Sequence, residues 1–370
     1  MMGILDMFSG GSLESKLKRL SRTIEESEYD DAEEALLELR VAISRKHPPG
    51  SEMTVRLDLC EVKLRVKYQQ FDRVEGPARR AYASAKGLLG KDLLQQTSEA
   101  LLWCAVRGGR LGETVELAEQ WIAVASPDFK QRVDVLITKG SALNQLGRFN
   151  DALRSYEAAV RVVEAMPDTP DRHERFVTAT SGMGDAYLGL DDRPQAINCW
   201  RQAMAATRTQ LGDEHPQVAS ILVCIGTVQL NADEIEPACG SFSQALEVFR
   251  AAGHAESMGA AIALQKLALA NLMKGEVMRA GTLAQEALKA SQAHGPEMRG
   301  EAQELLRKIE DAKIVAPGTM TSPKLIKPEE PAVEILPNDR TIFPGRGPAL
   351  RPAARPGRTN INANWAALGR

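Results

Sequence analysis

The sequence predicts an all-α protein, a right-handed α-solenoid of about seven helical hairpins followed by a C-terminal capping helix and a disordered tail. Three observations lead to this prediction. Alternating runs of β-branched residues are almost absent before Val315, and apolar residues recur at helical spacing. Turn signals at positions such as Gly147 and Gly275 interrupt these runs at short intervals. A repeat period of about 42 residues then indicates stacked hairpins rather than separate domains.

The second helix of each predicted hairpin starts with a small residue, has a large one four positions later and a small one three positions after that. Ala152, Tyr156 and Ala159 show the pattern most clearly. It starts again at Ala196, Ala238 and Ala280 and, more weakly, at Ala32, Val74 and Thr114. Twelve positions before these starts, the first helices carry Gly140, Gly184, Gly226 and Ala268, whereas Leu20, Val62 and Leu102 stand there in the first three units. Small residues let two helices approach closely, so we expect the hairpins to interlock.

This pattern resembles the tetratricopeptide repeat. The period near 42, together with the segment Leu211–Ala219, resembles the longer repeats of the kinesin-light-chain type. The resemblance covers about Leu13 to Ala312. It implies that the first helices line a concave groove, which in such arrays commonly holds an extended peptide or a partner helix.

The chain divides into three expected parts. Residues 1–12 form a flexible N-terminus, and residues 13–314 form the solenoid, with the strongest repeats at 133–290 and the capping helix at 297–314. Residues 315–370 form a Pro/Arg-rich disordered tail, because nine of the nineteen prolines fall between Pro317 and Pro356. Ile361, Trp365 and Leu368 would align on a short helix at its end, which predicts a docking motif for a partner or for the protein's own groove.

Composition excludes several classes of protein. The net charge is −3, with 44% hydrophobic and 26% charged residues, as in ordinary folded domains. We expect no membrane span and no secretory signal, since the sequence has no stretch of eighteen apolar residues and no basic leader. The five cysteines show neither metal-binding nor disulfide spacing, which favours reduced thiols and a cytoplasmic location.

No motif in the sequence points to catalysis. Gly182, Gly184 and Gly189 resemble a glycine-rich nucleotide loop, but no predicted strand precedes them. His215, His254 and His294 fall in equivalent loops, where a role in turns and helix caps competes with a metal site. We therefore expect a protein that is not an enzyme and has no cofactor, metal or small-molecule substrate.

The candidate binding residues follow from the groove that the resemblance implies. Arg56, Lys63 and Lys67 place positive charge on one first helix, which would suit an acidic partner or simply be a solvated face. Trp103 is the best anchor candidate, because tryptophan is frequent at binding hot spots. The other candidates face the groove from the remaining first helices, namely Val106, Ile137, Ser141, Asn144, Asp185, Leu188, Val223, Thr227, Leu230 and Leu269.

These observations predict a scaffold or adapter that binds other proteins through its groove and tail. One alternative is a regulatory receptor whose groove holds a peptide or its own tail. A second is a nucleic-acid-associated factor, since residues 340–370 contain six arginines and no acidic residue. We expect neither nucleic acid nor membrane among its main partners and leave homo-oligomers open.

Overall fold

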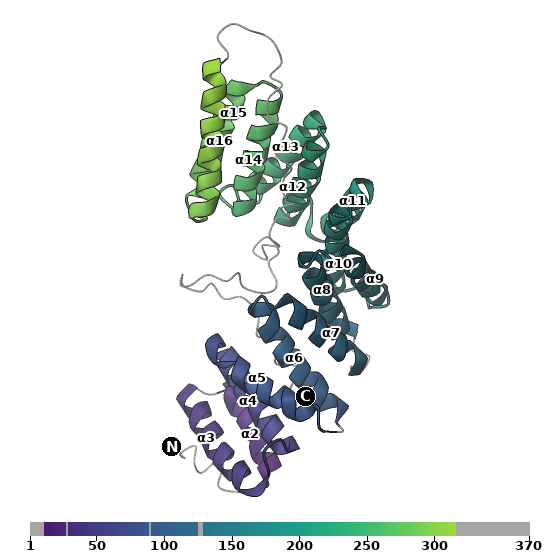
Figure 1. Ribbon diagram of the computed structural model, residues 1–370, viewed down its shortest axis with the longest axis vertical. Helices are drawn as coiled ribbons and strands as arrows, with labels where there is room; N and C mark the ends of the chain where they lie inside the picture. Colours follow the sequence, from purple (N-terminus) through teal and green to yellow (C-terminus); the bar gives the residue numbers. More distant parts are fainter. Residues whose placement is uncertain (1–10, 27–28, 89, 125–128, 316–370) are drawn as a thin grey trace. The chain divides into compact units, whose positions relative to one another are not determined.

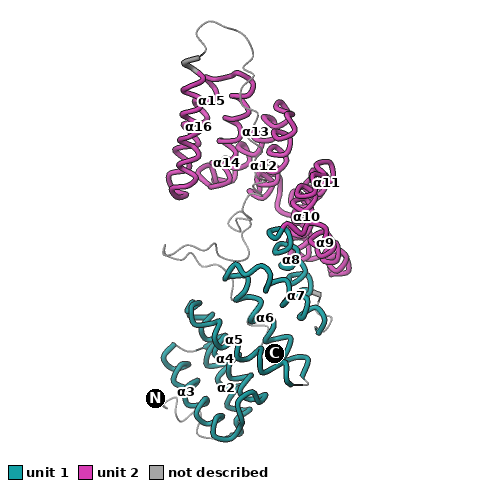
Figure 2. Tube along the Cα trace, viewed as in Figure 1, with its two compact units in different colours: residues 1–146, 345–370 teal, residues 147–344 magenta. Residues whose placement is uncertain are grey.

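The computed structural model describes residues 11–26, 29–88, 90–124 and 129–315, and every regular element in these ranges is helical. The chain forms two compact units (Figure 2). Among the described residues, unit 1 contains those up to 146 and unit 2 those from 147 to 315. The all-α fold predicted from the sequence is confirmed.

The described part of unit 1 contains three helical hairpins and one further helix (Figure 1). The hairpins are α2 (Leu13–Glu26) with α3 (Tyr29–Lys46), α4 (Glu52–Lys67) with α5 (Glu75–Ala85), and α6 (Lys91–Arg107) with α7 (Leu111–Val124). A short 3-10 helix, η1 (Phe71–Arg73), links α4 to α5, and α8 (Phe129–Gln145) packs on α7. The first helix of one hairpin also contacts the first helix of the next, α2 with α4 and α4 with α6.

Unit 2 repeats this arrangement. It starts with α9 (Phe149–Glu164) and continues with the hairpins α10 (Pro170–Gly189) with α11 (Arg193–Leu211), α12 (Pro216–Asn231) with α13 (Ile235–Ala251), and α14 (Met258–Met273) with α15 (Val277–Ser291). The last helix, α16 (Pro296–Val315), packs on both α14 and α15. It occupies the place of the capping helix that the sequence predicted at 297–314.

The repeat register read from the sequence is confirmed by burial. Each predicted triplet of the second helices is at most 2% exposed. These triplets are Ala32, Leu36, Leu39; Val74, Ala78, Ala81; Thr114, Ala118, Trp121; Ala152, Tyr156, Ala159; Ala196, Trp200, Ala203; Ala238, Phe242, Ala245; and Ala280, Ala284, Ala287. The first three units therefore follow the same register, although larger residues replace the small one in their first helices.

Glycines in the first helices meet aromatic rings from the second helices. A Cβ atom added at Gly184 would lie 2.5 Å from Trp200 Nε1, and one at Gly226 would lie 2.8 Å from the Phe242 ring. Real Cβ contacts do not come this close, so only glycine lets these helices pack at the observed distance. The rings are buried, with Trp200 2% exposed and Phe242 0% exposed.

Several of the described turns inside hairpins share one conformation. Gly275 between α14 and α15 has φ +82°, and the equivalent positions Asp191 and Asp233 also have positive φ, +60° and +62°. The amide of the following residue donates to a carbonyl five positions earlier, as Glu276 does to Asn271. This is a Schellman-type helix end, which favours glycine and tolerates aspartate. Asp192 then caps α11 by accepting from the Gln195 amide, as its position before the helix suggests.

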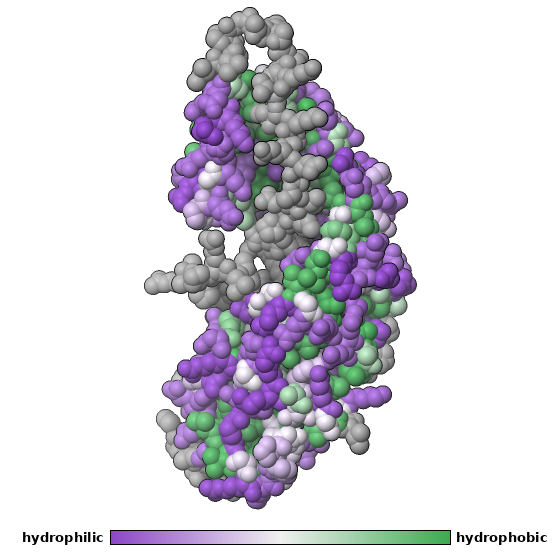
Figure 3. All heavy atoms as spheres, viewed as in Figure 1, coloured by the Kyte–Doolittle hydropathy of each residue, from purple (hydrophilic) through white to green (hydrophobic). Residues whose placement is uncertain are grey.

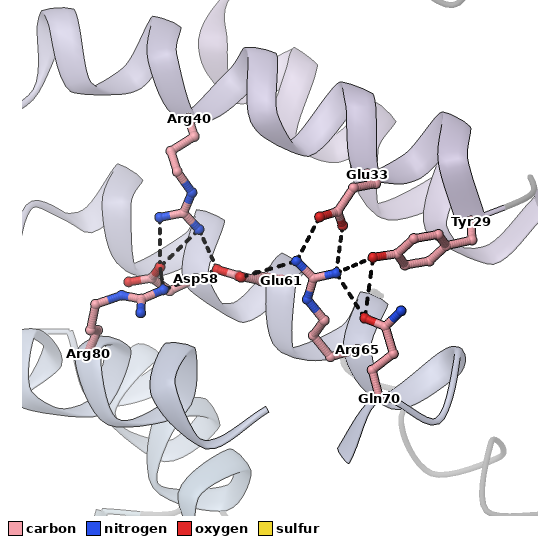
Figure 4. A network of polar contacts seen from close by, with 8 residues as sticks. All are labelled: Tyr29, Glu33, Arg40, Asp58, Glu61, Arg65, Gln70 and Arg80. Carbon is pink, nitrogen blue, oxygen red and sulfur yellow. Dashed lines mark hydrogen bonds and ion pairs between the residues drawn. The ribbon is translucent and has the colours of Figure 1, made fainter. Parts of the chain in front are cut away.

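An ion-pair network joins three helices of unit 1 (Figure 4). Arg65 of α4 is 8% exposed and binds Glu33 of α3 through both terminal nitrogens, at 2.7 and 2.8 Å. Glu61 of α4 accepts from Arg40 of α3 at 2.5 Å and from Arg80 of α5 at 3.1 Å. Each guanidinium that is removed from water here keeps a carboxylate partner, so the network fixes α3 and α5 against α4.

Candidate functional site

We call the predicted groove residues of the first helices the first-helix stripe, and we describe its members in each unit separately. They differ in exposure. Ser141, Asn144, Val223 and Leu230 are buried and contribute mainly to packing, with exposed fractions of 9% or less. The partly exposed members offer contacts to a partner, and they are Lys63, Lys67, Trp103, Val106, Ile137, Asp185, Leu188, Thr227 and Leu269. Arg56 is exposed, with 47% of its side chain accessible.

The three predicted cations of α4 differ in whether they already bind another group of the protein. Arg56 binds Glu52 one turn earlier, with Nη2 2.7 Å from Oε1. Lys67 donates to the carbonyls of Ile24 and Glu25, at 2.5 and 2.9 Å, and so completes the C-terminal end of α2. Lys63 has no carboxylate within 4 Å in the described ranges. Of the three predicted cations, Lys63 is therefore the one that keeps its charge for a partner.

Trp103 belongs to an aromatic group that the sequence did not reveal. Its ring centroid lies 5.6 Å from that of Phe71 in η1, with an angle of 47° between the planes. The guanidinium of Arg107, one turn further along α6, lies 3.9 Å from the Phe71 centroid and 4.9 Å from that of Trp103. Trp103 also packs against the core of unit 1 beside Val106. Part of its side chain therefore contributes to folding, and the rest is exposed to solvent.

Asp185 is the one carboxylate in the part of the first-helix stripe contributed by unit 2. The indole N–H of Trp200 donates to it, and burial raises its pKa from 3.8 to about 7. Cys224 of α12 lies close enough for the two groups to interact electrostatically. Asp185 thus holds a proton near neutral pH more readily than a surface aspartate does, and a cation brought beside it would restore its charge.

The glycine-rich segment of α10 is part of the packing. Gly182, Gly184 and Gly189 all lie within this one helix, so they form no phosphate-binding loop. A Cβ at Gly182 would lie 2.4 Å from the Tyr156 ring, and one at Gly189 would lie 2.3 Å from the ring of Phe149. All three glycines serve close helix contacts, which the sequence analysis recognised only for Gly184.

The loop histidines act on backbone groups. His215 caps α12 by accepting from the Gln217 amide through Nδ1, and His294 Nε2 lies 2.7 Å from the Glu256 carbonyl. Burial is the main cause that lowers the pKa of His215, and the nearby His254 lowers it further. The described residues contain no group of three or more His, Cys, Asp or Glu side chains arranged to hold a metal ion.

The cysteines are unpaired, and burial makes them poor nucleophiles. It raises the pKa of Cys60 and Cys199 to about 11 and that of Cys104 and Cys224 to about 12. None of the described helices is both long and apolar enough to cross a membrane. The predicted tail motif of Ile361, Trp365 and Leu368 lies outside the described residues.

Hydrophilic side chains cover most of the described surface seen in Figure 3, and hydrophobic ones appear between them in smaller areas. Two hollows lie outside the first-helix stripe, one beside Tyr82 and Leu117 in unit 1 and the other beside Leu246 and Leu264 in unit 2.

Comparison with known proteins finds relatives by structure alone. No protein-family model matches the sequence, and no curated protein matches it significantly. The structure of RapI in its apo form is 11% identical, with a TM-score of 0.61 over 83% of this chain and 82% of that one. Aspartyl phosphate phosphatase F from Bacillus subtilis is 13% identical, with a TM-score of 0.53 over 82% and 84%.

A third match is a kinesin light chain with TPR-like repeats from Podospora anserina, 16% identical, which covers 54% of this chain and 97% of its own, with a TM-score of 0.43. The likeness to the first two structures shows the fold. With the repeat register seen in the helices, it shows a helical-repeat fold of the tetratricopeptide type.

Proposed function

We propose that this helical-repeat protein is a non-enzymatic scaffold or adapter that binds a segment of another protein along its first-helix stripe. The observation that carries the proposal is that apolar residues of the first-helix stripe stay partly exposed within each unit. Trp103, Val106 and Ile137 do so in unit 1, and Leu188 and Leu269 do so in unit 2. Partly exposed apolar groups on a surface are typical of a protein-binding site.

Several observations support the non-enzymatic part of the proposal. His215 and His294 bind backbone groups, and four of the thiols have pKa values of about 11 or 12, too high for nucleophilic attack near neutral pH. One structural neighbour is named a phosphatase, but at 13% identity its likeness concerns the fold alone. The unpaired cysteines also support a cytoplasmic location, because thiols stay reduced in that compartment.

The proposal is tested by capturing partners with the full chain and with Trp103→Ala. The variant should lose at least about tenfold in retained partner while its unfolding curve changes little, since Trp103 is only partly buried. Leu37→Ala is the matched control, because Leu37 is 55% exposed on α3 and outside the stripe. Equal capture by wild type and Trp103→Ala would contradict the proposal, and a large loss of stability would make Trp103 a core residue instead.

Removal of residues 340–370 separates the alternative functions. A scaffold that uses its tail loses one partner while the stripe still binds another. A receptor inhibited by its own tail gains binding when the tail is removed. A nucleic-acid-associated factor loses salt-sensitive retention on DNA or RNA, because such binding depends on released counterions.

A further inference from the structure

Arg107 is held in an unusual setting on α6. Its guanidinium carbon lies 3.9 Å from the centroid of Phe71 and 4.9 Å from that of Trp103, so two ring faces surround the cation. Cation–π attraction holds the group in place, and it leaves the N–H donors in the guanidinium plane free of it. Nη1 is buried and has no hydrogen-bond partner among the residues that the structure describes.

The absence of a counter-ion sets Arg107 apart from other arginines of unit 1. Arg65 binds Glu33 and Glu61, and Arg110 binds Glu75 and Glu113. Within the described ranges, no carboxylate oxygen lies within 4 Å of Arg107.

The pKa directions agree with this difference. Burial lowers the pKa of Arg107, whereas hydrogen bonds to glutamates raise the pKa of Arg65 and Arg79. A guanidinium that has lost part of its hydration without gaining an anion raises the free energy of the folded protein. A carboxylate placed beside it would offset that desolvation penalty.

We propose that Arg107, between Phe71 and Trp103, binds a carboxylate side chain in an acidic segment of the partner protein that lies along the first-helix stripe. This inference rests on the proposed function and adds the chemical class of the partner. Because Nη1 is buried, the paired donors that remain for a carboxylate are Nε and Nη2, and the rings fix the plane in which they donate. Trp103 and Val106 supply the adjoining apolar contact, and Lys63 on the neighbouring α4 adds an unpaired positive charge.

The charge of the chain itself favours a partner over the distal tail as the occupant. Residues 340–370 contain six arginines and no acidic residue, so this segment would repel Arg107 and Lys63. The acidic residues Glu329, Glu330, Glu334 and Asp339 form the rival occupant within the chain. Their replacement by the corresponding amides tests that rival directly.

The experiment measures fluorescence anisotropy of short capped peptides added to the full-length protein. The probe alternates glutamate with leucine, and the matched peptides carry glutamine or lysine in place of glutamate. We expect the glutamate peptide to bind at least about tenfold more tightly than the glutamine peptide. Arg107→Gln should abolish this preference, and Arg107→Lys should keep part of it, because lysine preserves the charge but not the paired donors. Arg79→Gln, which changes an exposed arginine of α5 that binds Glu75 and Glu113, should leave it unchanged.

Four results would overturn the inference. The first is a glutamate preference that survives Arg107→Gln in a folded variant. The second is competition by an oligothymidylate as strong as that by the glutamate peptide, which would make the surface a general polyanion site. The third is a tenfold gain in peptide affinity when the four acidic tail residues become amides, which would make the tail the occupant.

The fourth result concerns the other peptides and separates this inference from the proposed function. If the glutamine or lysine peptide binds as well as the glutamate peptide, and does so only with Trp103 intact, the proposed function stands and the carboxylate site falls. If none of the three peptides binds, both fall.

Discussion

A methyl group added at Gly184 tests how closely α10 packs against Trp200 of α11. The Cβ of Gly184→Ala would lie 2.5 Å from Trp200 Nε1 and 2.7 Å from Cδ1, both well inside contact distance. Trp200 is 2% exposed and so has little room to move. Overpacking of this kind typically costs about 1–3 kcal/mol, and the better helix propensity of alanine returns about 1 kcal/mol.

The matched control is Gly240→Ala in α13. Gly240 is exposed, and a Cβ there would meet no atom within 4 Å. This variant should therefore gain about 0.5–1 kcal/mol from helix propensity alone. We expect Gly184→Ala to be less stable than Gly240→Ala by about 1–3 kcal/mol, because the gain in helix propensity is common to both, measured by urea unfolding followed by circular dichroism. Equal shifts of the two midpoints would refute the close packing of α10 against α11.

Three further outcomes follow from buried charges and thiols. Because the pKa of Asp185 is raised to about 7 in the folded protein, its ionisation lowers the free energy of unfolding as the pH rises from about 4 to about 7. Asp185→Asn should therefore be more stable than wild type by about 1–3 kcal/mol at pH 8 and equally stable at pH 4. A difference in unfolding free energy that does not change with pH would contradict this. Arg65→Met leaves the Glu33 carboxylate without its Arg65 partner and should lower the free energy of unfolding by about 2–4 kcal/mol in thermal or urea unfolding. An unchanged free energy would mean that the network contributes only specificity. Burial raises the pKa of Cys60 to about 11 and that of Cys104 to about 12. Both thiols should therefore react with a disulfide reagent at pH 8 far more slowly in the native protein than in urea. Equal rates would show that the helices open freely.

The repeat architecture could be predicted because it depends on local spacing. The positions of Ala196, Trp200 and Ala203 within one helix reveal which face is buried, and the same spacing returns in every unit. Even the weak triplet at Thr114, Ala118 and Trp121 follows it, with exposures of 2%, 0% and 0%.

The pairing of charges could not be predicted in the same way. Glu33 and Arg65 are 32 positions apart and meet only because two helices pack at a particular angle. The setting of Arg107 could not be predicted from the sequence. What distinguishes this residue is that no carboxylate of the described residues lies near it in the folded protein, and its position in the sequence does not reveal this. Gly182 and Gly189 did carry a signal, since glycine inside a helical pattern usually has a packing reason.

The most direct test of the fold is a double-mutant cycle that combines Gly184→Ala with Trp200→Leu. Leucine at position 200 leaves room for the added methyl group, so the alanine should cost less in that background than in the wild type. We predict a coupling free energy of at least about 1 kcal/mol from urea unfolding of the four proteins. Strict additivity would show that the glycine and the ring do not meet, and would contradict the interlocked hairpins.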